Sequence, residues 1–228
     1  MQARGGGSPS ARSRVHRRRF GQYCGSGEGT RDLAGGCPAT TLEGDPLFDS
    51  ADAPRGPALE FVTMALGWDP APGRFDPGRA VADIDLNASA FLFSDQVLVD
   101  VVFHEQLTSK DGAVRHLGDS TTGQGDGDNE VIVADLGRLP GDVTSIVYVV
   151  TSYTGQSFDH IANPFCRVVD GVTGAEIVHI DLGHHAHTGF VVGAVARRDG
   201  IWRLHPIGKT IPARHPSEAV PHLVRLME

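Results

Sequence analysis

Residues 83–93 read Asp-Ile-Asp-Leu-Asn-Ala-Ser-Ala-Phe-Leu-Phe. Successive side chains of an extended chain point to opposite sides, so Asp83, Asp85 and Asn87 would all project to one side. The apolar residues that alternate with them, and the aromatic run that follows, are typical of a buried strand. This stretch therefore predicts a strand over 84–93 that begins with a row of oxygen-bearing side chains.

Similar short runs rich in Val, Ile and Phe recur on both sides of this segment, separated by Gly, Asp, Asn and Pro. The predicted strands are 59–68, 84–93, 97–103, 131–136, 143–153, 165–169, 176–182, 190–196 and 201–207. Arg198-Asp199-Gly200 predicts a hairpin turn between the last two. Residues 217–227 have helical spacing after Ser217, a candidate N-cap. The pattern predicts an all-β fold, an antiparallel sandwich or barrel, with a short C-terminal helix.

Residues 1–57 differ from the rest of the chain in composition. They contain eight arginines against six acidic residues, and 21 of them are Gly, Pro or Ser, whereas eight are large and apolar. Such a segment buries too little surface to offset the backbone entropy lost on folding, about 1–2 kcal/mol per residue. We therefore expect a low-complexity, disordered extension over 1–57, a folded domain over 58–212, and a tail or short helix over 213–228.

The composition of the whole chain excludes several classes of protein. Its 228 residues carry a formal net charge of −8, whereas a general nucleic-acid binder needs a basic face, so no nucleic-acid partner is expected. The sequence contains no apolar run of the roughly 18 residues that a membrane-spanning helix needs. Three cysteines are too few for a disulfide scaffold and favour a reducing compartment. We expect a cytoplasmic location.

A second acidic segment, here called the acidic loop, covers residues 118–130. It holds four carboxylates among four glycines. Two carboxylates about 5 Å apart repel by about 3 kcal/mol at an effective dielectric constant near 20, so a bound cation is expected. Oxygen ligands without a partnering cysteine favour Ca²⁺ over Mg²⁺. The predicted metal ligands are Asp83, Asp85, Asn87, Asp119, Gln124, Asp126, Asp128 and Glu130. Neither segment has EF-hand spacing, and a solvated strand face and a flexible polar loop are the alternatives.

A rival metal site is conceivable at residues 179–187, which contain His179, His184, His185, His187 and one aspartate. Zinc accepts three or four such ligands. The run has no cysteine and no helical His-Glu-x-x-His pattern, so a polar loop after a strand is the favoured interpretation. The chain also lacks a Gly-x-Ser-x-Gly elbow after a strand, which disfavours a serine hydrolase.

The combined pattern resembles the TerD-like tellurium-resistance family. The segments that carry the resemblance occur in the family's order: Leu66-Gly-Trp68-Asp69, residues 83–90, Ser109-Lys-Asp111-Gly112, His116-Leu-Gly118-Asp119 and residues 123–130. The resemblance covers about residues 58–208. It implies a β-sandwich of two antiparallel sheets that binds Ca²⁺ through these acidic segments. It also implies a cytoplasmic or peripherally membrane-associated protein linked to tellurite, phage and other stress, and supplies no catalytic residues.

The chain departs from the family pattern at several positions. Asn87 and Asn129 stand where the family has Asp, Asp126 stands where Glu is usual, residues 104–106 replace a pair of Asn, and the family's opening strand is missing before Leu59. The expected function is a non-catalytic, Ca²⁺-binding stress-response module. The alternatives are a Ca²⁺-dependent adaptor, bound to membranes or to other tellurium-resistance or stress proteins, and a metal-dependent enzyme.

Overall fold

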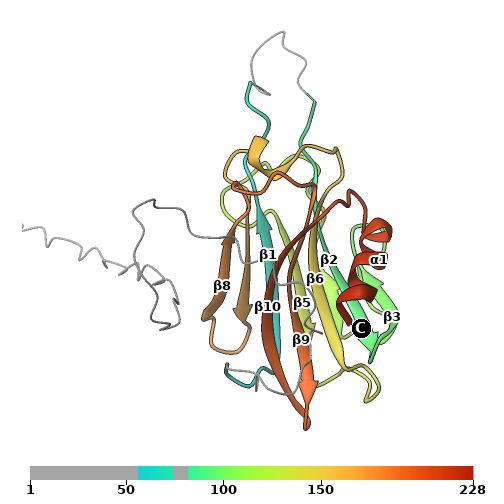
Figure 1. Ribbon diagram of the computed structural model, residues 1–228. Coiled ribbons are helices and arrows are strands. Elements are labelled where there is room, and N and C mark those ends of the chain that lie inside the picture. The colour runs from blue at the N-terminus through green and yellow to red at the C-terminus, as the bar shows by residue number, and fades with distance from the viewer. Residues whose placement is uncertain (1–55, 74–81, 228) are drawn as a thin grey trace, which may run out of the picture. The chain divides into compact units, whose positions relative to one another are not determined.

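The computed structural model describes residues 56–73 and 82–227, which contain ten strands, one short 3₁₀ helix and one α-helix (Figure 1). These are β1 (Phe61–Gly67), β2 (Leu86–Ser94), β3 (Val97–Val102), β4 (Val114–His116), β5 (Glu130–Asp135), β6 (Ser145–Ser152), η1 (Phe158–His160), β7 (Phe165–Asp170), β8 (Glu176–Asp181), β9 (Gly189–Arg198), β10 (Ile201–Ile211) and α1 (Pro216–Met227). All but two of the residues predicted as an extension, 1–57, lie outside the described part of the chain.

The strands form two five-stranded sheets, so the predicted sandwich is confirmed. The first sheet has the order β4-β5-β1-β7-β8 and the second β10-β9-β6-β2-β3, and every strand pair is antiparallel. β9 and β10 join through Asp199 and Gly200, whose φ angles of 53° and 77° suit a two-residue hairpin turn. The predicted turn at residues 198–200 is therefore confirmed.

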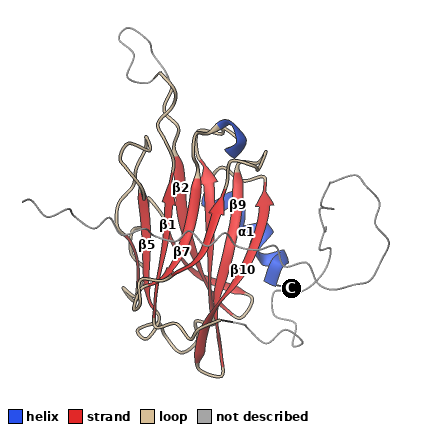
Figure 2. Ribbon diagram, turned by 90° about the vertical axis from the view of Figure 1, so that its left-hand side faces the viewer, coloured by secondary structure: helices blue, strands red, loops and turns tan. Residues whose placement is uncertain are grey.

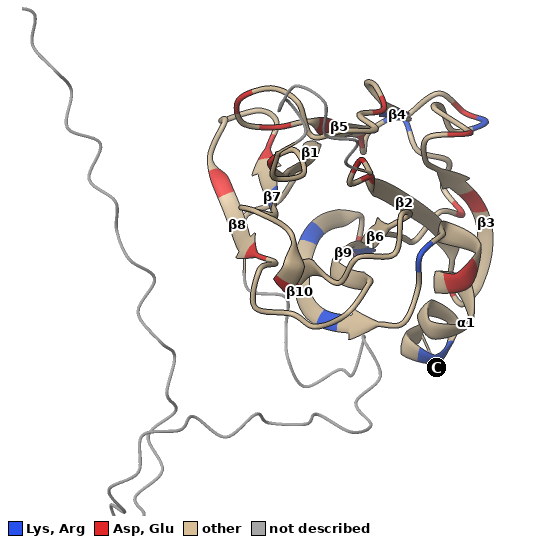
Figure 3. Cartoon of the chain, turned by 90° about the horizontal axis from the view of Figure 1, so that it is seen from above, with Lys and Arg blue, Asp and Glu red and all other residues tan. Residues whose placement is uncertain are grey.

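The second sheet is buried on both faces, which explains the long apolar runs of its central strands. Alternate residues of β2 face the first sheet, among them Leu86 and Leu92 in the main core. Phe91 and Phe93 face the other way and pack with Leu223 and Met227 of α1. Figures 2 and 3 show α1 outside the second sheet. The sheet is thus enclosed between another sheet and a helix.

The helix begins one residue earlier than predicted, at Pro216. Proline suits the first helical position because its missing N–H would have no intrahelical partner there. Ser217, expected as the N-cap, is the second residue of the helix, and its N–H donates to Nδ1 of His215 at 3.2 Å. Glu218 accepts a hydrogen bond from the N–H of Arg214 at 2.8 Å. These contacts fix the segment that enters α1. No helix in the described residues is long and apolar enough to cross a membrane.

Strand register brings several strand ends to one end of the sandwich. Leu86 at the start of β2 pairs with Ser152 at the end of β6, and Ile211 at the end of β10 pairs with Gly189 at the start of β9. The three-residue strand β4, which the sequence did not predict, pairs with β5 on the first sheet. The end of the sandwich where β2 begins and β6 ends, uppermost in Figure 1 and facing the viewer in Figure 3, carries most of the predicted ligands.

Candidate metal centre

Trp68 holds the two acidic segments together at this end of the sandwich. Its side chain is 2% exposed, and its indole N–H donates to the carbonyl of Ile84 at 3.0 Å. Its backbone N–H donates to Oδ1 of Asn129 at 2.8 Å. Gly123, at a φ of +65°, lies so close to the indole that a side chain there would collide with it. Trp68 is thus a buried aromatic residue that positions both segments.

Asp85 and Asn87 lie side by side, as the alternation in sequence predicts. The Asn87 amide donates to Oδ1 of Asp85 at 2.9 Å. The backbone of Asp85 is fixed by the end of β6: its N–H donates to Oγ1 of Thr154 at 3.0 Å, and its carbonyl accepts from the N–H of Tyr153 at 2.9 Å. The backbone that carries the Asp85 carboxylate is therefore fixed through both its N–H and its carbonyl group.

Asp119 approaches this pair from the acidic loop. Burial and the negative charge of Asp119 raise the pKa of Asp85 to about 6, while the Asn87 amide opposes that shift. Among the described residues, no Lys or Arg forms an ion pair with either carboxylate. Asp83 is half-buried two residues before Asp85. The start of β2 thus has two facing carboxylates whose charge the described side chains do not neutralise.

Asp128, near the other end of the acidic loop, is already paired. Arg167 of β7 donates from Nε to one carboxylate oxygen at 2.9 Å and from a terminal nitrogen to the other at 2.6 Å. This fork matches the geometry of a carboxylate and is among the stronger protein ion pairs. Both oxygens of Asp128 are therefore occupied by the protein itself.

Glu130 is also satisfied by the protein. Its side chain is buried, and it accepts hydrogen bonds from the N–H of Ala88 at 2.7 Å and of Ser120 at 3.2 Å. Nε2 of His116, also buried, lies 3.3 Å from the same carboxylate. Burial raises the pKa of Glu130, and the hydrogen bonds with His116 and the two amides counteract it. Glu130 joins β2, β4 and the acidic loop in one buried polar network.

The remaining predicted ligands, Gln124 and Asp126, are exposed. Within the described residues, neither side chain makes a hydrogen bond or ion pair. The structure therefore divides the eight predicted ligands into three groups. Asp85, Asn87 and Asp119 interact at the start of β2, where Asp83 precedes Asp85 by two residues; Asp128 and Glu130 are held by protein donors, and Gln124 and Asp126 face solvent. Among the described residues, no three of the predicted carboxylates converge as a group of metal donors.

Residues 179–187 do not bring three donor atoms together within the described chain. The ring of His179 stacks on Phe165, with centroids 5.3 Å apart, and that of His185 contacts Phe190 at 4.8 Å. His184 lies 3.5 Å from Asp181. These contacts fit the interpretation of the run as a polar loop better than that of a metal site.

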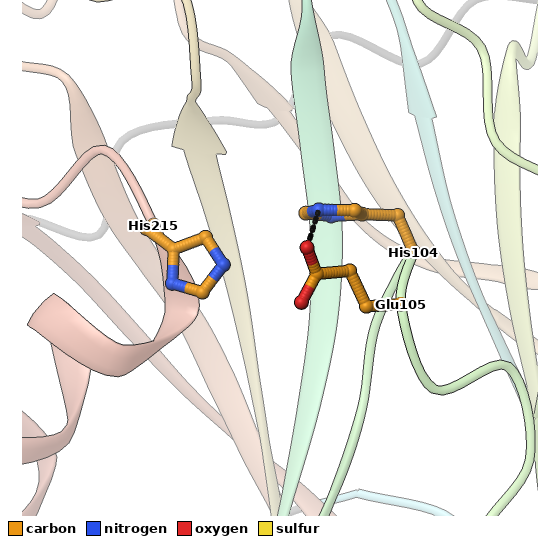
Figure 4. Close-up of side chains that lie close together, drawn as sticks. All are labelled: His104, Glu105 and His215. Carbon is orange, nitrogen blue, oxygen red and sulfur yellow. Dashed lines mark ion pairs between the residues drawn. The ribbon is translucent and has the colours of Figure 1, made fainter.

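A different group of side chains meets nearby. One donor atom each from His104, Glu105 and His215 lie within 4.8 Å of one another, and Figure 4 shows the three side chains facing a common point. Burial lowers the pKa of His104, while the charges of Asp119 and Glu105 oppose this shift. Sequence reasoning did not predict this histidine cluster (His104, Glu105 and His215), because its members come from the end of β3 and the start of α1.

The donors at the start of β2 fit a hard cation. Asp85 and Asp119 supply carboxylate oxygens and Asn87 an amide oxygen, which are ligands that Ca²⁺ accepts. Burial is the main cause of the raised pKa of Asp85, and the negative charge of Asp119 adds to it, so a positive charge here would favour the ionised carboxylate. A bound cation would supply that charge, and Asp83 is close enough in sequence to join the set.

Comparison with known proteins identifies relatives of this chain. The TerD domain family matches residues 52–214 of the chain. The tellurium resistance protein TerZ of Serratia marcescens is 39% identical over 69% of this chain and 83% of its own length. General stress protein 16U of Bacillus subtilis (strain 168) is 32% identical over 67% of this chain and 81% of its own length.

The fold also matches solved structures. The crystal structure of the unknown function protein SAV2460 is 27% identical with a TM-score of 0.63, over 72% of this chain and 96% of that one. A homologue of the telluride resistance protein TerD, SCO6318 from Streptomyces coelicolor A3(2), has the same TM-score at 23% identity, over 71% of this chain and 95% of that one, and shows the fold alone. The family match covers most of the chain, and the chain therefore belongs to the TerD family.

Proposed function

We propose that this protein is a non-catalytic, calcium-binding member of its family that acts in tellurium resistance or another stress response. Relatives that it matches over most of their length are named as tellurium resistance and general stress proteins. The proposed calcium ligands are Asp83, Asp85, Asn87 and Asp119, at the start of β2 and of the acidic loop.

One observation carries the cation part of this proposal. Asp85 is half-buried, faces Asp119, and has a pKa raised to about 6 by burial and by that second charge. Holding two ionised carboxylates together costs free energy that a divalent cation would recover. Calcium suits the site better than magnesium because it accepts irregular sets of six to eight oxygens, including backbone carbonyls and water.

Isothermal titration calorimetry of the full chain with Ca²⁺ and with Mg²⁺ tests the proposal. We expect Ca²⁺ to bind, Mg²⁺ to bind much more weakly, and Asp85→Asn to weaken Ca²⁺ binding by about tenfold or more. Asp142→Asn is the matched control, because Asp142 is exposed in the loop before β6, at the opposite end of that strand. Calcium binding that is absent in the wild type, or equal in both variants, would contradict the proposal.

A biological readout connects the site to stress. A tellurite-sensitive host that expresses the wild-type chain should survive tellurite better than one that expresses Asp85→Asn at equal abundance. Equal survival would separate calcium binding from resistance, whereas calorimetry would still report on the cation site alone.

A second candidate function is that of a cytoplasmic adaptor that binds membranes when calcium is present. Three exposed apolar side chains favour it. Leu107 is 45% exposed, Leu117 61% and Tyr153 55%. Leu117 directly precedes the acidic loop, Tyr153 is hydrogen-bonded to Asp85, and Leu107 is hydrogen-bonded to His116. Apolar side chains beside a bound cation suit contact with an anionic surface.

Co-sedimentation with vesicles that contain phosphatidylserine tests this candidate. The wild type should sediment in Ca²⁺ and not in EDTA, and Leu117→Ser should sediment less while it still binds Ca²⁺ in calorimetry. Val172→Ser is the matched control, because Val172 is also 61% exposed but lies in the β7–β8 turn.

A further inference from the structure

We propose that His104, Glu105 and His215 form a second metal site, for a borderline divalent transition metal such as Zn²⁺, beside the predicted calcium site. The inference goes beyond calcium binding and does not depend on it. It rests on the chemical type of the three donors, on their convergence from distant parts of the chain, and on the contacts that orient each histidine.

The donor set selects the type of metal. Two imidazoles and one carboxylate are the protein ligands of many zinc sites in which a fourth position is left for water. Imidazole nitrogens are poor ligands for Ca²⁺, which prefers oxygen. The histidine cluster and the carboxylates at the start of β2 would therefore recognise different ions, although both lie at the same end of the sandwich.

Convergence from distant segments distinguishes this cluster from a chance surface pair. His104 and Glu105 follow the end of β3, whereas His215 immediately precedes α1. The three donor atoms lie within 4.8 Å of one another, and Figure 4 shows the side chains of both segments facing each other. Tetrahedral zinc with bonds of 2.0–2.1 Å needs donors about 3.4 Å apart, so the donor atoms would have to approach one another by at most about 1.4 Å. Exposed Glu105 and half-buried His215 can do this by side-chain rotation.

The surroundings of the histidines orient their rings. Nδ1 of His215 accepts the backbone N–H of Ser217 at 3.2 Å and lies 2.8 Å from the hydroxyl of the same residue, so the first turn of α1 fixes the orientation of this ring. Phe103 packs edge-on against both imidazoles, with ring centroids 5.2 Å from His104 and 5.8 Å from His215. Nδ1 of His104 is buried and has no hydrogen-bond partner among the described residues, and Nε2 lies 3.9 Å from Glu105.

Zinc binding by the full-length protein tests the inference. The protein is titrated with ZnCl₂ against a coloured zinc chelator, and with Co²⁺, whose visible absorption reports four-coordinate nitrogen and oxygen ligation. We expect one zinc site, weakened at least tenfold by His104→Gln and by His215→Gln, and less by Glu105→Gln. Circular dichroism of each variant confirms that it is folded, and Glu105→Gln, at an exposed position, gives a second test if a histidine variant does not fold.

The matched control is His184→Gln combined with His187→Gln. These two histidines belong to the other histidine-rich run and would account for adventitious capture of Zn²⁺. The inference is overturned if the wild type binds no zinc, if His104→Gln and His215→Gln leave the affinity unchanged, or if the control removes the binding. Asp85→Asn should retain zinc binding, and His215→Gln should retain calcium binding, so failure of one site is distinguishable from failure of the other.

Discussion

The two ends of the acidic loop use carboxylates in opposite ways. Asp119, at its start, faces another carboxylate, that of Asp85, and no described Lys or Arg pairs with either. Asp128, near its end, is held by both nitrogens of an arginine fork, and Glu130 by two backbone amides and a buried histidine. One segment thus supplies both a candidate cation site and part of the protein's internal framework. Counting acidic residues does not identify ligands, because protein donors already neutralise some of them.

The largest effect should come from removing the buried carboxylate. Glu130→Ala leaves the amides of Ala88 and Ser120 and the ring of His116 without their acceptor, so the free energy of unfolding should fall by about 3 kcal/mol or more. Urea denaturation measures this value. Asp126→Ala, at an exposed position of the same loop, is the control and should change it by less than about 0.5 kcal/mol. Equal urea midpoints for the wild type and Glu130→Ala would mean that the hydrogen-bond network around Glu130 adds little to stability.

Calcium should stabilise the wild type and fail to stabilise Asp85→Asn. At about 100 times its dissociation constant, a ligand adds about 2.7 kcal/mol, which corresponds to a rise in Tm of roughly 5–10 °C for a domain of this size. Thermal melting in EDTA and in millimolar Ca²⁺ measures the rise. Asp128→Asn should keep it, because its carboxylate is already bound by Arg167. If both variants lose the response equally, the distinction between the two ends of the loop is wrong.

The two asparagines should respond differently to conversion into aspartate. Asn87→Asp adds a carboxylate beside Asp85 and should tighten Ca²⁺ binding by about tenfold. Asn129→Asp should change it little, because Oδ1 of that residue accepts the backbone N–H of Trp68. Calorimetric titration of both variants compares them directly. Equal tightening would place position 129 at the cation as well.

A smaller effect is expected from the ion pair between Asp128 and Arg167. Both side chains are partly exposed, so solvent screening limits the contribution of the pair to about 0.5–1 kcal/mol despite its fork geometry. A double-mutant cycle of Asp128→Asn and Arg167→Gln in urea isolates the coupling. A coupling of about 3 kcal/mol would show that this pair is as important to the fold as Glu130.

The smallest effect is on the pH dependence of the calcium-free protein. The folded pKa of Asp85, about 6, is above its unfolded value of 3.8, so the folded state binds more protons across this window. Stability should therefore fall as the pH rises from about 4 to 6, and the loss should be complete above that range. Because Asp85 is about half exposed, solvent screening reduces the effect well below the full value of the pKa shift. Relative to Asp85→Asn in EDTA, wild-type Tm should therefore fall by about 1–2 °C across this range. A difference in Tm between the wild type and Asp85→Asn that does not vary with pH would contradict the raised pKa of Asp85.

The sequence predicted most of the fold because apolar runs and turns are local signals. Nine of the ten strands overlap the predicted runs, and the Asp199-Gly200 turn occurs where expected. β4 was missed because it has three residues and depends on pairing with β5, which no local pattern encodes. The start of α1 was predicted one residue too late, because Pro216 is itself the first residue of the helix.

The candidate site was only partly predictable, because several of its contacts join residues that are far apart in sequence. Alternation along an extended chain predicted correctly that Asp85 and Asn87 share a side. The contacts that neutralise other carboxylates depend on register across the sheet: Arg167 is 39 residues from Asp128 in sequence. The histidine cluster likewise needs the end of β3 and the start of α1 to lie at the same place.

The helix on the outer face of the second sheet also sets the order in which the chain can fold. Phe91 and Phe93 of β2 are covered by residues of α1, and Gln96 donates a hydrogen bond to Met227, 131 residues later in the chain. During synthesis, this aromatic face therefore stays uncovered until the helical segment has left the ribosome. Folding that waits for such distant contacts is slow and leaves apolar strands open to association. A nascent chain stalled before residue 216 should be the form of this protein most prone to aggregate.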